Sequence, residues 1–162
     1  SEELLRSICD QVRSLIKIAE EENVSISHIK PHGALYDQAA KDTHLARVIG
    51  NAVDRVAPDL DIMCLSGSLM VKILEDMGLK VVQEAFADRT YERDGGLRDR
   101  GSDRALITDP QKAADQARSI FEDKKIITFD GSEISLEAQT LCVHSDTPNA
   151  IAIAREVRLV LR

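Results

Sequence analysis

Hydrophobic residues recur at intervals of three and four along several parts of the chain, the spacing that places them on one face of a helix. The first such segment covers about residues 2–22, where leucine, isoleucine and valine are interspersed with charged residues. Four further segments show the same spacing, and polar residues before the last three predict where those helices begin. These helices are predicted over about 42–57, from the Ser66–Ser68 cap to Met77, from Asp109 to about Glu122, and over about 148–160 with Thr147 as the cap.

Short apolar runs between these helices predict strands. The runs cover 26–30, 61–65, 79–86 and 140–143, and a hairpin is predicted around Asp130-Gly131. Helices and strands that alternate in this way indicate an α/β fold with a mostly parallel sheet. Four parallel strands are too few to close a (β/α) barrel, so the expected fold is either an open sheet or part of a larger barrel.

Composition narrows the class of protein. The 162 residues are 43% hydrophobic and 30% charged, as in a soluble globular protein, and we expect residues 1–162 to form a single domain. The net charge of −7 argues against nucleic-acid binding, which needs a basic surface, and no apolar run is long enough to span a membrane. The three cysteines lack the spacing of a disulfide framework or metal site, and no signal peptide is recognisable. We therefore expect a reduced, cytoplasmic protein.

Ionisable residues at the ends of the predicted strands are the best candidates for chemistry. Lys30 and His32 follow the first strand and would share a face, so that the lysine could hold an anion while the histidine moves a proton. Glu84 and Asp88 share a face where the third strand ends. Paired carboxylates can divide acid and base roles, and the adjacent Arg89 would keep one of them ionised.

Three further segments offer polar groups. His144 and Asp146 follow the last strand, where both could ligate a metal or Asp146 could orient His144. Ser66–Ser68 places two hydroxyls and backbone N–H groups at a helix N-terminus, which is either an anion site or only a cap. The charged loop over 87–104 is unusually long, and its arginines, including Arg100, either close over an anionic ligand or are solvated.

Four motifs lie in order along nearly the whole chain: SHIKPHGALY at 27–36, EAFADRTY at 84–91, DGGL at 94–97 and VHSDTP at 143–148. Together they resemble the LamB/YcsF family. The resemblance implies an irregular (β/α) barrel of the polysaccharide-deacetylase-like type, with mostly parallel strands. The segments DLNCDLGE and CGFHAGD, with which members of this family begin, do not occur here. We therefore expect the chain to be the C-terminal part of a larger barrel. We also expect it to form a homo-oligomer, in which self-association covers the exposed apolar face.

The resemblance also implies an activity, which is the ATP-dependent hydrolytic opening of 5-oxo-L-proline to L-glutamate by an enzyme with two companion subunits, B and C. ATP would phosphorylate the lactam carbonyl oxygen, after which water attacks, the ring opens, and an acyl phosphate is hydrolysed. A requirement for a divalent metal stays open. Two alternatives remain: a metal-dependent amide or ester hydrolase of the deacetylase type with His32, His144 and Asp146 as ligands, and a non-catalytic fragment that keeps only an interaction surface.

Under the first hypothesis the ionisable residues divide the work. Either Lys30 or Arg89 would hold negative charge, and one of the two histidines would move protons, while the carboxylates of the third strand bind the ring N–H or activate water. The last aspartate would orient the histidine before it. The six candidate catalytic residues are Lys30, His32, Glu84, Asp88, His144 and Asp146. The expected substrate contacts are Tyr36, Arg89, Arg100, Ser66 and Ser68.

Overall fold

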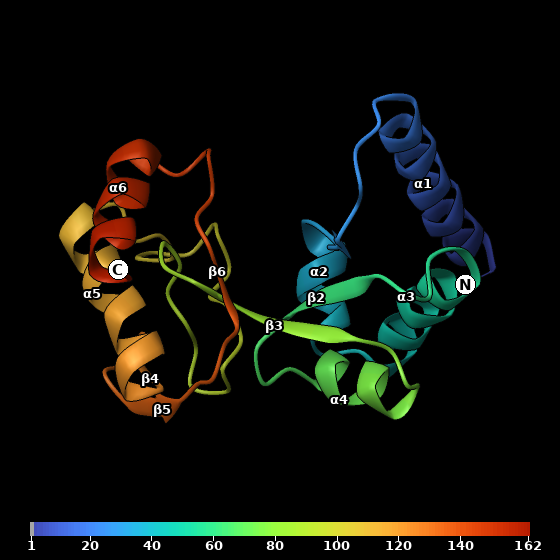
Figure 1. Ribbon diagram of the computed structural model, residues 1–162. Coiled ribbons are helices and arrows are strands. Elements are labelled where there is room, and N and C mark those ends of the chain that lie inside the picture. The colour runs from blue at the N-terminus through green and yellow to red at the C-terminus, as the bar shows by residue number, and fades with distance from the viewer. Residues whose placement is uncertain (1) are drawn as a thin grey trace. The chain divides into compact units, whose positions relative to one another are not determined.

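The computed structural model describes residues 2–162, which form two compact units. The first unit runs to Cys64 and includes Ser68–Val82, and the second comprises Leu65–Gly67 and Gln83–Arg162. Each unit contains helices and strands, drawn in Figure 1. The strands β2 (Asp61–Leu65) and β3 (Val81–Phe86) contribute residues to both units.

Three long helices build the core of the first unit. They are α1 (Glu2–Glu21), α3 (Thr43–Val56) and α4 (Leu69–Asp76). Helix α3 packs against both α1 and α4, as the predicted apolar faces require. It begins where expected because the Asp42 carboxylate accepts hydrogen bonds from two N–H groups of its first turn. The buried core includes Ile8, Ala46, Ile49, Val53, Ile62, Met70 and Leu74.

The first strand is shorter than predicted. β1 covers only His28–Ile29, pairs in parallel with β2, and is followed by the short helix α2 (Ala34–Ala39). The backbone turns at Gly33, whose φ of 60° suits glycine. Pro31, which has no N–H to donate to a sheet, comes two residues after β1 ends.

In the second unit the sheet continues from β3 to β6 (Thr140–Cys142). These strands are parallel, and Phe86 pairs with Cys142 at their carboxyl ends. The hydrogen-bonded order is β1-β2-β3-β6, so the predicted α/β fold with mostly parallel strands is confirmed. The predicted hairpin is also present, as the antiparallel strands β4 (Lys125–Ile127) and β5 (Glu133–Ser135).

Two helices of the second unit pack side by side. α5 (Pro110–Arg118), extended by the π-helical segment η1 (Ser119–Asp123), lies against α6 (Ala150–Val160), as Figure 1 shows. Helix α5 begins as predicted, with Asp109 as a side-chain cap. Helix α6 begins later than predicted: Asn149, and not Thr147, occupies its N-cap position.

The contact between these two helices is made by small side chains. Ala117 is fully buried among Ile153 and Val157. We expect Ala117→Leu to lower the free energy of unfolding by about 1–3 kcal/mol, the usual cost of extra methylene groups in a packed core. Lys112→Leu on the exposed side of α5 is the matched control, and denaturant unfolding is the measurement. Equal stability of the two variants would show that this helix contact is loose.

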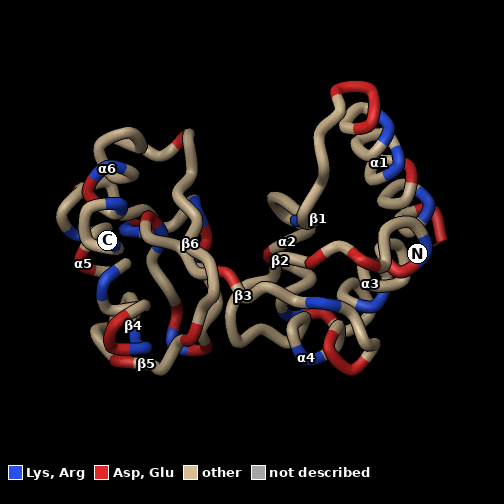
Figure 2. Tube along the Cα trace, in the orientation of Figure 1, with Lys and Arg blue, Asp and Glu red and all other residues tan. Residues whose placement is uncertain are grey.

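Charged residues lie both on the helices and in the loops, above all in the loop over 87–104. Figure 2 shows both signs distributed along α1, where most polar residues are exposed. Of the three cysteines, Cys9 and Cys64 are buried and Cys142 is half-buried. Among residues 2–162, no helix combines the length and the apolar character needed to cross a membrane.

Candidate active site

Asp88 lies at the centre of the candidate site. It follows the end of β3 by two residues, and its side chain has no exposed surface. A buried carboxylate is unfavourable unless hydrogen-bond donors surround it. The residues that supply those donors therefore define the site.

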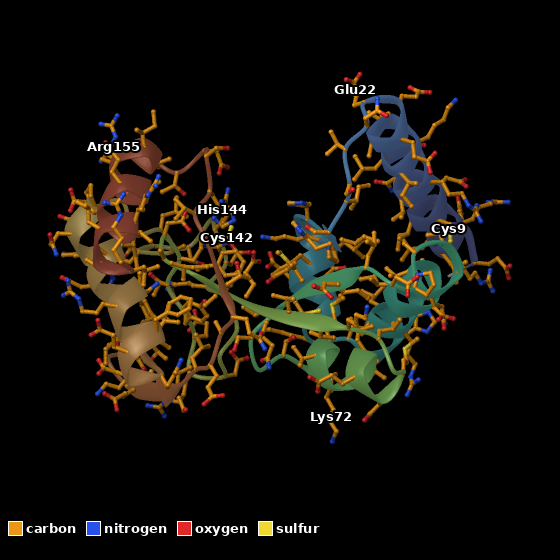
Figure 3. All side chains as sticks on the ribbon, viewed as in Figure 1. Cys9, Glu22, Lys72, Cys142, His144 and Arg155 are labelled. Atoms are coloured by element: carbon orange, nitrogen blue, oxygen red, sulfur yellow. The ribbon has the colours of Figure 1, made fainter. Side chains whose placement is uncertain are left out.

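The donors to this carboxylate come from the segment after β6. The His144 backbone N–H donates to Oδ2 of Asp88 at 3.0 Å, and His144 Nδ1 lies 3.1 Å from both carboxylate oxygens. The Thr147 hydroxyl donates to Oδ2 at 2.6 Å. The register of the sheet explains the meeting, because Phe86 pairs with Cys142 and the residues two positions further on then face each other. Figure 3 shows His144 beside Cys142.

These hydrogen bonds keep Asp88 ionised. Burial alone would raise the pKa of its carboxyl group, but the hydrogen bonds from His144 and Thr147 outweigh burial and lower the pKa below its ordinary value. The contributions that lower it thus come from His144 and Thr147, whereas sequence reasoning assigned this task to Arg89. The buried charge can stabilise a positive imidazolium at His144.

The His144 ring is held in one orientation. Its Nδ1 faces an anionic carboxylate, so Nδ1 carries the proton and the lone pair is on Nε2. The ring stacks on Phe86 with centroids 5.3 Å apart and an interplanar angle of 13°. About a quarter of the side chain, 27%, stays exposed. An oriented imidazole with a basic nitrogen and access to solvent is suited to general acid–base chemistry.

Asp146 does not orient His144, which corrects the prediction from sequence. Its carboxylate instead pairs with Arg100, whose two terminal nitrogens lie 2.6 and 3.3 Å from Oδ2 and Oδ1. The hydrogen bond from Arg100 lowers the pKa of Asp146. The prediction failed because β6 ends at Cys142 and Ser145-Asp146 form a turn, so the rule that residues i and i+2 share a face does not apply there.

Thr147 is the residue that sequence reasoning misplaced most. It was expected to cap the last helix, yet its hydroxyl binds Asp88 in the interior. Only the pairing of β3 with β6 could have placed it near Asp88, and that pairing is not visible in the residues themselves.

The loop over 87–104 is folded onto the second unit. Arg89 is buried and donates to the carbonyl of Arg98, whose own guanidinium lies 3.4 Å from the ring centroid of Phe129. Arg98 also pairs with Glu92 at 2.5 Å. These contacts hold the loop against the hairpin turn. Closure of the loop over an anionic ligand stays a prediction.

The first unit carries the Lys30 and His32 candidates. Both border a pocket of about 480 Å³ that also includes His28 and Gln11 and is otherwise mainly aliphatic. Lys30 Nζ lies 5.6 Å from the ring centroid of Tyr36, which is buried. Lys30 and His32 lie beyond the end of β1, so the predicted sharing of a strand face does not hold, although both reach the same pocket.

The two serines of the predicted anion site differ. Ser66 belongs to the second unit, is buried, and donates its hydroxyl to the carbonyl of Glu137. Ser68 belongs to the first unit and is the N-cap residue of α4, but its side chain makes no capping hydrogen bond within the described residues. The hydroxyl of Ser66 is therefore engaged with the protein backbone.

The candidate residues are thus divided between the units. The first unit holds Lys30, His32, Tyr36 and Ser68. The second holds Ser66, Glu84, Asp88, Arg89, Arg100, His144 and Asp146. Within the described part of either unit, no three His, Cys, Asp or Glu side chains are grouped as metal ligands. The arrangement that the structure does assemble is the buried Asp88 with His144 and Thr147.

Comparisons with known proteins agree with this fold. Residues 1–162 match the sequence model described as the LamB/YcsF family. The chain is 45% identical over 148 residues to the 5-oxoprolinase A subunit of Chloroflexus aggregans, covering 91% of this chain and 59% of that protein. It is 43% identical over 151 residues to the 5-oxoprolinase A subunit of Bordetella pertussis, covering 93% of this chain and 60% of that protein.

A solved structure is also similar. The crystal structure of a lactam utilization protein from Thermus thermophilus matches with a TM-score of 0.89 at 38% identity, covering 99% of this chain and 64% of that one. This chain therefore spans about 60% of the length of the curated relatives that it matches. A match over the whole chain, together with relatives above 40% identity, establishes the family predicted from the motifs. The chain belongs to the LamB/YcsF family.

Proposed function

We propose that the chain acts in the A subunit of a 5-oxoprolinase, which hydrolyses the lactam of 5-oxo-L-proline to L-glutamate with ATP. The observation that carries the proposal is the pairing of the buried Asp88 carboxylate with the oriented, partly exposed ring of His144. The curated relatives carry the name of the 5-oxoprolinase A subunit, and that name points to the substrate.

Lactam hydrolysis needs a group that accepts a proton and later returns it. His144 Nε2 takes a proton from the attacking water, whose oxygen bonds to the lactam carbonyl carbon. The imidazolium that forms is stabilised by the Asp88 carboxylate. The carbon–nitrogen bond of the ring then breaks, and the proton passes from His144 to the departing nitrogen. One water is consumed by these steps, and His144 returns to its starting form.

ATP is the co-substrate in this proposal. An amide carbonyl is a poor electrophile, and transfer of the terminal phosphoryl group of ATP to its oxygen releases ADP and makes the carbon more open to attack by water. Ring opening then leaves an acyl phosphate of glutamate, which a second water hydrolyses to glutamate and phosphate. No residue of this chain is assigned to the nucleotide. We further propose that subunits B and C are the companion proteins, since relatives named as an A subunit imply other subunits. The burial of Cys9 and Cys64, as expected of thiols that pack as small hydrophobic groups, supports a reduced, cytoplasmic setting.

The test is ATP-dependent release of glutamate from 5-oxoproline. Because this chain spans about 60% of its relatives, we would exchange it for the matching segment of the Chloroflexus aggregans protein and add that organism's subunits B and C. We expect glutamate only when ATP and all three subunits are present. An inactive chimera beside an active unmodified complex would contradict the proposal. Hydrolysis that needs a metal but no ATP would favour the deacetylase-type alternative.

A further inference from the structure

The amide of Gln116 contacts the turn that carries Asp88. Gln116 lies on α5, and its Nε2 is 2.8 Å from the carbonyl oxygens of Phe86 and Arg89 and 3.3 Å from that of Ala87. A side-chain amide has two N–H donors, so the two short contacts use one each and the third is shared. The two carbonyl groups that it holds lie on either side of Asp88 in the sequence.

Further hydrogen bonds fix the rest of this turn. The N–H of Phe86 donates to the Tyr91 hydroxyl at 2.9 Å, and the Asp88 carbonyl accepts from the N–H of Ile107 at 2.9 Å. Gln116 is the only helix residue among these partners, and its helix is anchored by the packing of α5 on α6. It therefore connects a rigid element directly to the residues that place the carboxylate.

We propose that Gln116 is a positioning residue, which fixes residues 86–89 so that the Asp88 carboxylate faces His144 Nδ1. The effect of Gln116 on the position of the Asp88 carboxylate is argued from these contacts alone. Its effect on turnover rests on the proposed function. Sequence patterns gave no sign of this role, because Gln116 reads as an ordinary polar residue of an amphipathic helix.

A substitution that removes the donors but keeps the length of the side chain tests this role. Gln116→Met has no N–H to offer, and Gln111→Met is the matched control because Gln111 lies on the exposed side of the same helix and bonds only Asp115 among the described residues. The first readout is the side-chain ¹⁵N spectrum of His144 in this chain, which reports the nitrogen that carries the proton. We expect an Nδ1–H ring in the unmodified chain and the Gln111 variant, and a mixture with Nε2–H in Gln116→Met.

The second readout is steady-state kinetics of the chimera with its companion subunits. A displaced Asp88 carboxylate should lower kcat by at least about tenfold, because small displacements of catalytic groups slow a reaction strongly. The KM for 5-oxoproline should change little. The control variant should keep both constants. A folded Gln116→Met protein with an unchanged His144 spectrum would overturn the proposal.

Gln116→Asn is the second variant, for the case that the methionine variant does not fold. It keeps the amide but shortens its reach, so a smaller shift of the same ¹⁵N signals is expected. Unchanged signals in folded Gln116→Asn would equally overturn the proposal. The ¹⁵N spectrum does not depend on turnover. If the chimera without any substitution at Gln116 were inactive, that result would contradict the proposed function. The ¹⁵N signals would still decide the positioning role.

Discussion

Replacing His144 with glutamine is expected to lower the rate of glutamate formation by about 10²–10⁴-fold, the range typical for loss of a general acid–base residue. Glutamine is of comparable size and can donate to Asp88, but it cannot take up and release a proton. The Asp88 carboxylate would keep a donor, so the loss should appear in kcat more than in folding. The measurement is kcat for 5-oxoproline in the assembled complex, together with a thermal unfolding curve.

His44→Gln is the matched control for this experiment. His44 is exposed on α3 in the first unit and lies outside the candidate site. Its replacement should leave turnover unchanged, so that any loss in His144→Gln is specific to the position. Turnover of His144→Gln within twofold of the unmodified complex would remove His144 from the proton-transfer role. Lys30 and His32 would then be the next residues to test.

Much of the fold could be predicted from the chain because its signals are local. The apolar spacing that predicted helices over about 2–22 and 42–57 matches α1 and α3 to within one residue at each end, and the strand at 61–65 matches β2. Caps and turns depend on neighbouring residues, which is why Asp109 and the hairpin at Asp130-Gly131 were found. The parallel order follows from the alternation of elements.

The site was predicted only in part because its contacts are long-range. Asp88 and His144 are 56 residues apart, and they meet through the pairing of β3 with β6. Sequence reasoning placed both at strand ends but chose Asp146 as the partner of His144, since it assumed a strand where the chain turns. Thr147, which precedes the last helix, donates to the same carboxylate, and Gln116, within a helix, contacts the turn that carries it. Polar residues are ordinary at both kinds of position, so neither residue stood out in the sequence.

Asp88→Ala is expected to have the largest effect on stability, lowering the free energy of unfolding by about 3 kcal/mol. The substitution leaves the His144 N–H and the Thr147 hydroxyl without their acceptor, and hydrogen bonds to a charged group each contribute ~1.5–3 kcal/mol. Asp103→Ala is the control in the same loop, because the Asp103 side chain is 85% exposed and its loss should leave unfolding unchanged. Urea unfolding at pH 7 measures both, and equal midpoints would show that Asp88 contributes no net stability.

The stability that Asp88 contributes should also depend on pH. Its pKa is lower in the folded protein than its ordinary value of 3.8, so the unfolded chain binds more protons at acidic pH. The contribution is therefore present above about pH 3.8 and is lost as the pH falls through the folded value. The pKa values of other carboxyl groups, such as those of Asp130 and Asp146, are also lowered, so the comparison must be with Asp88→Asn, which cannot ionise. We expect the stability difference between the unmodified chain and Asp88→Asn to shrink as the pH falls below about 3.8. A difference that does not shrink below that pH would mean that the pKa of Asp88 is not lowered in the folded protein, and His144 would then lack the anionic partner on which its proposed role depends.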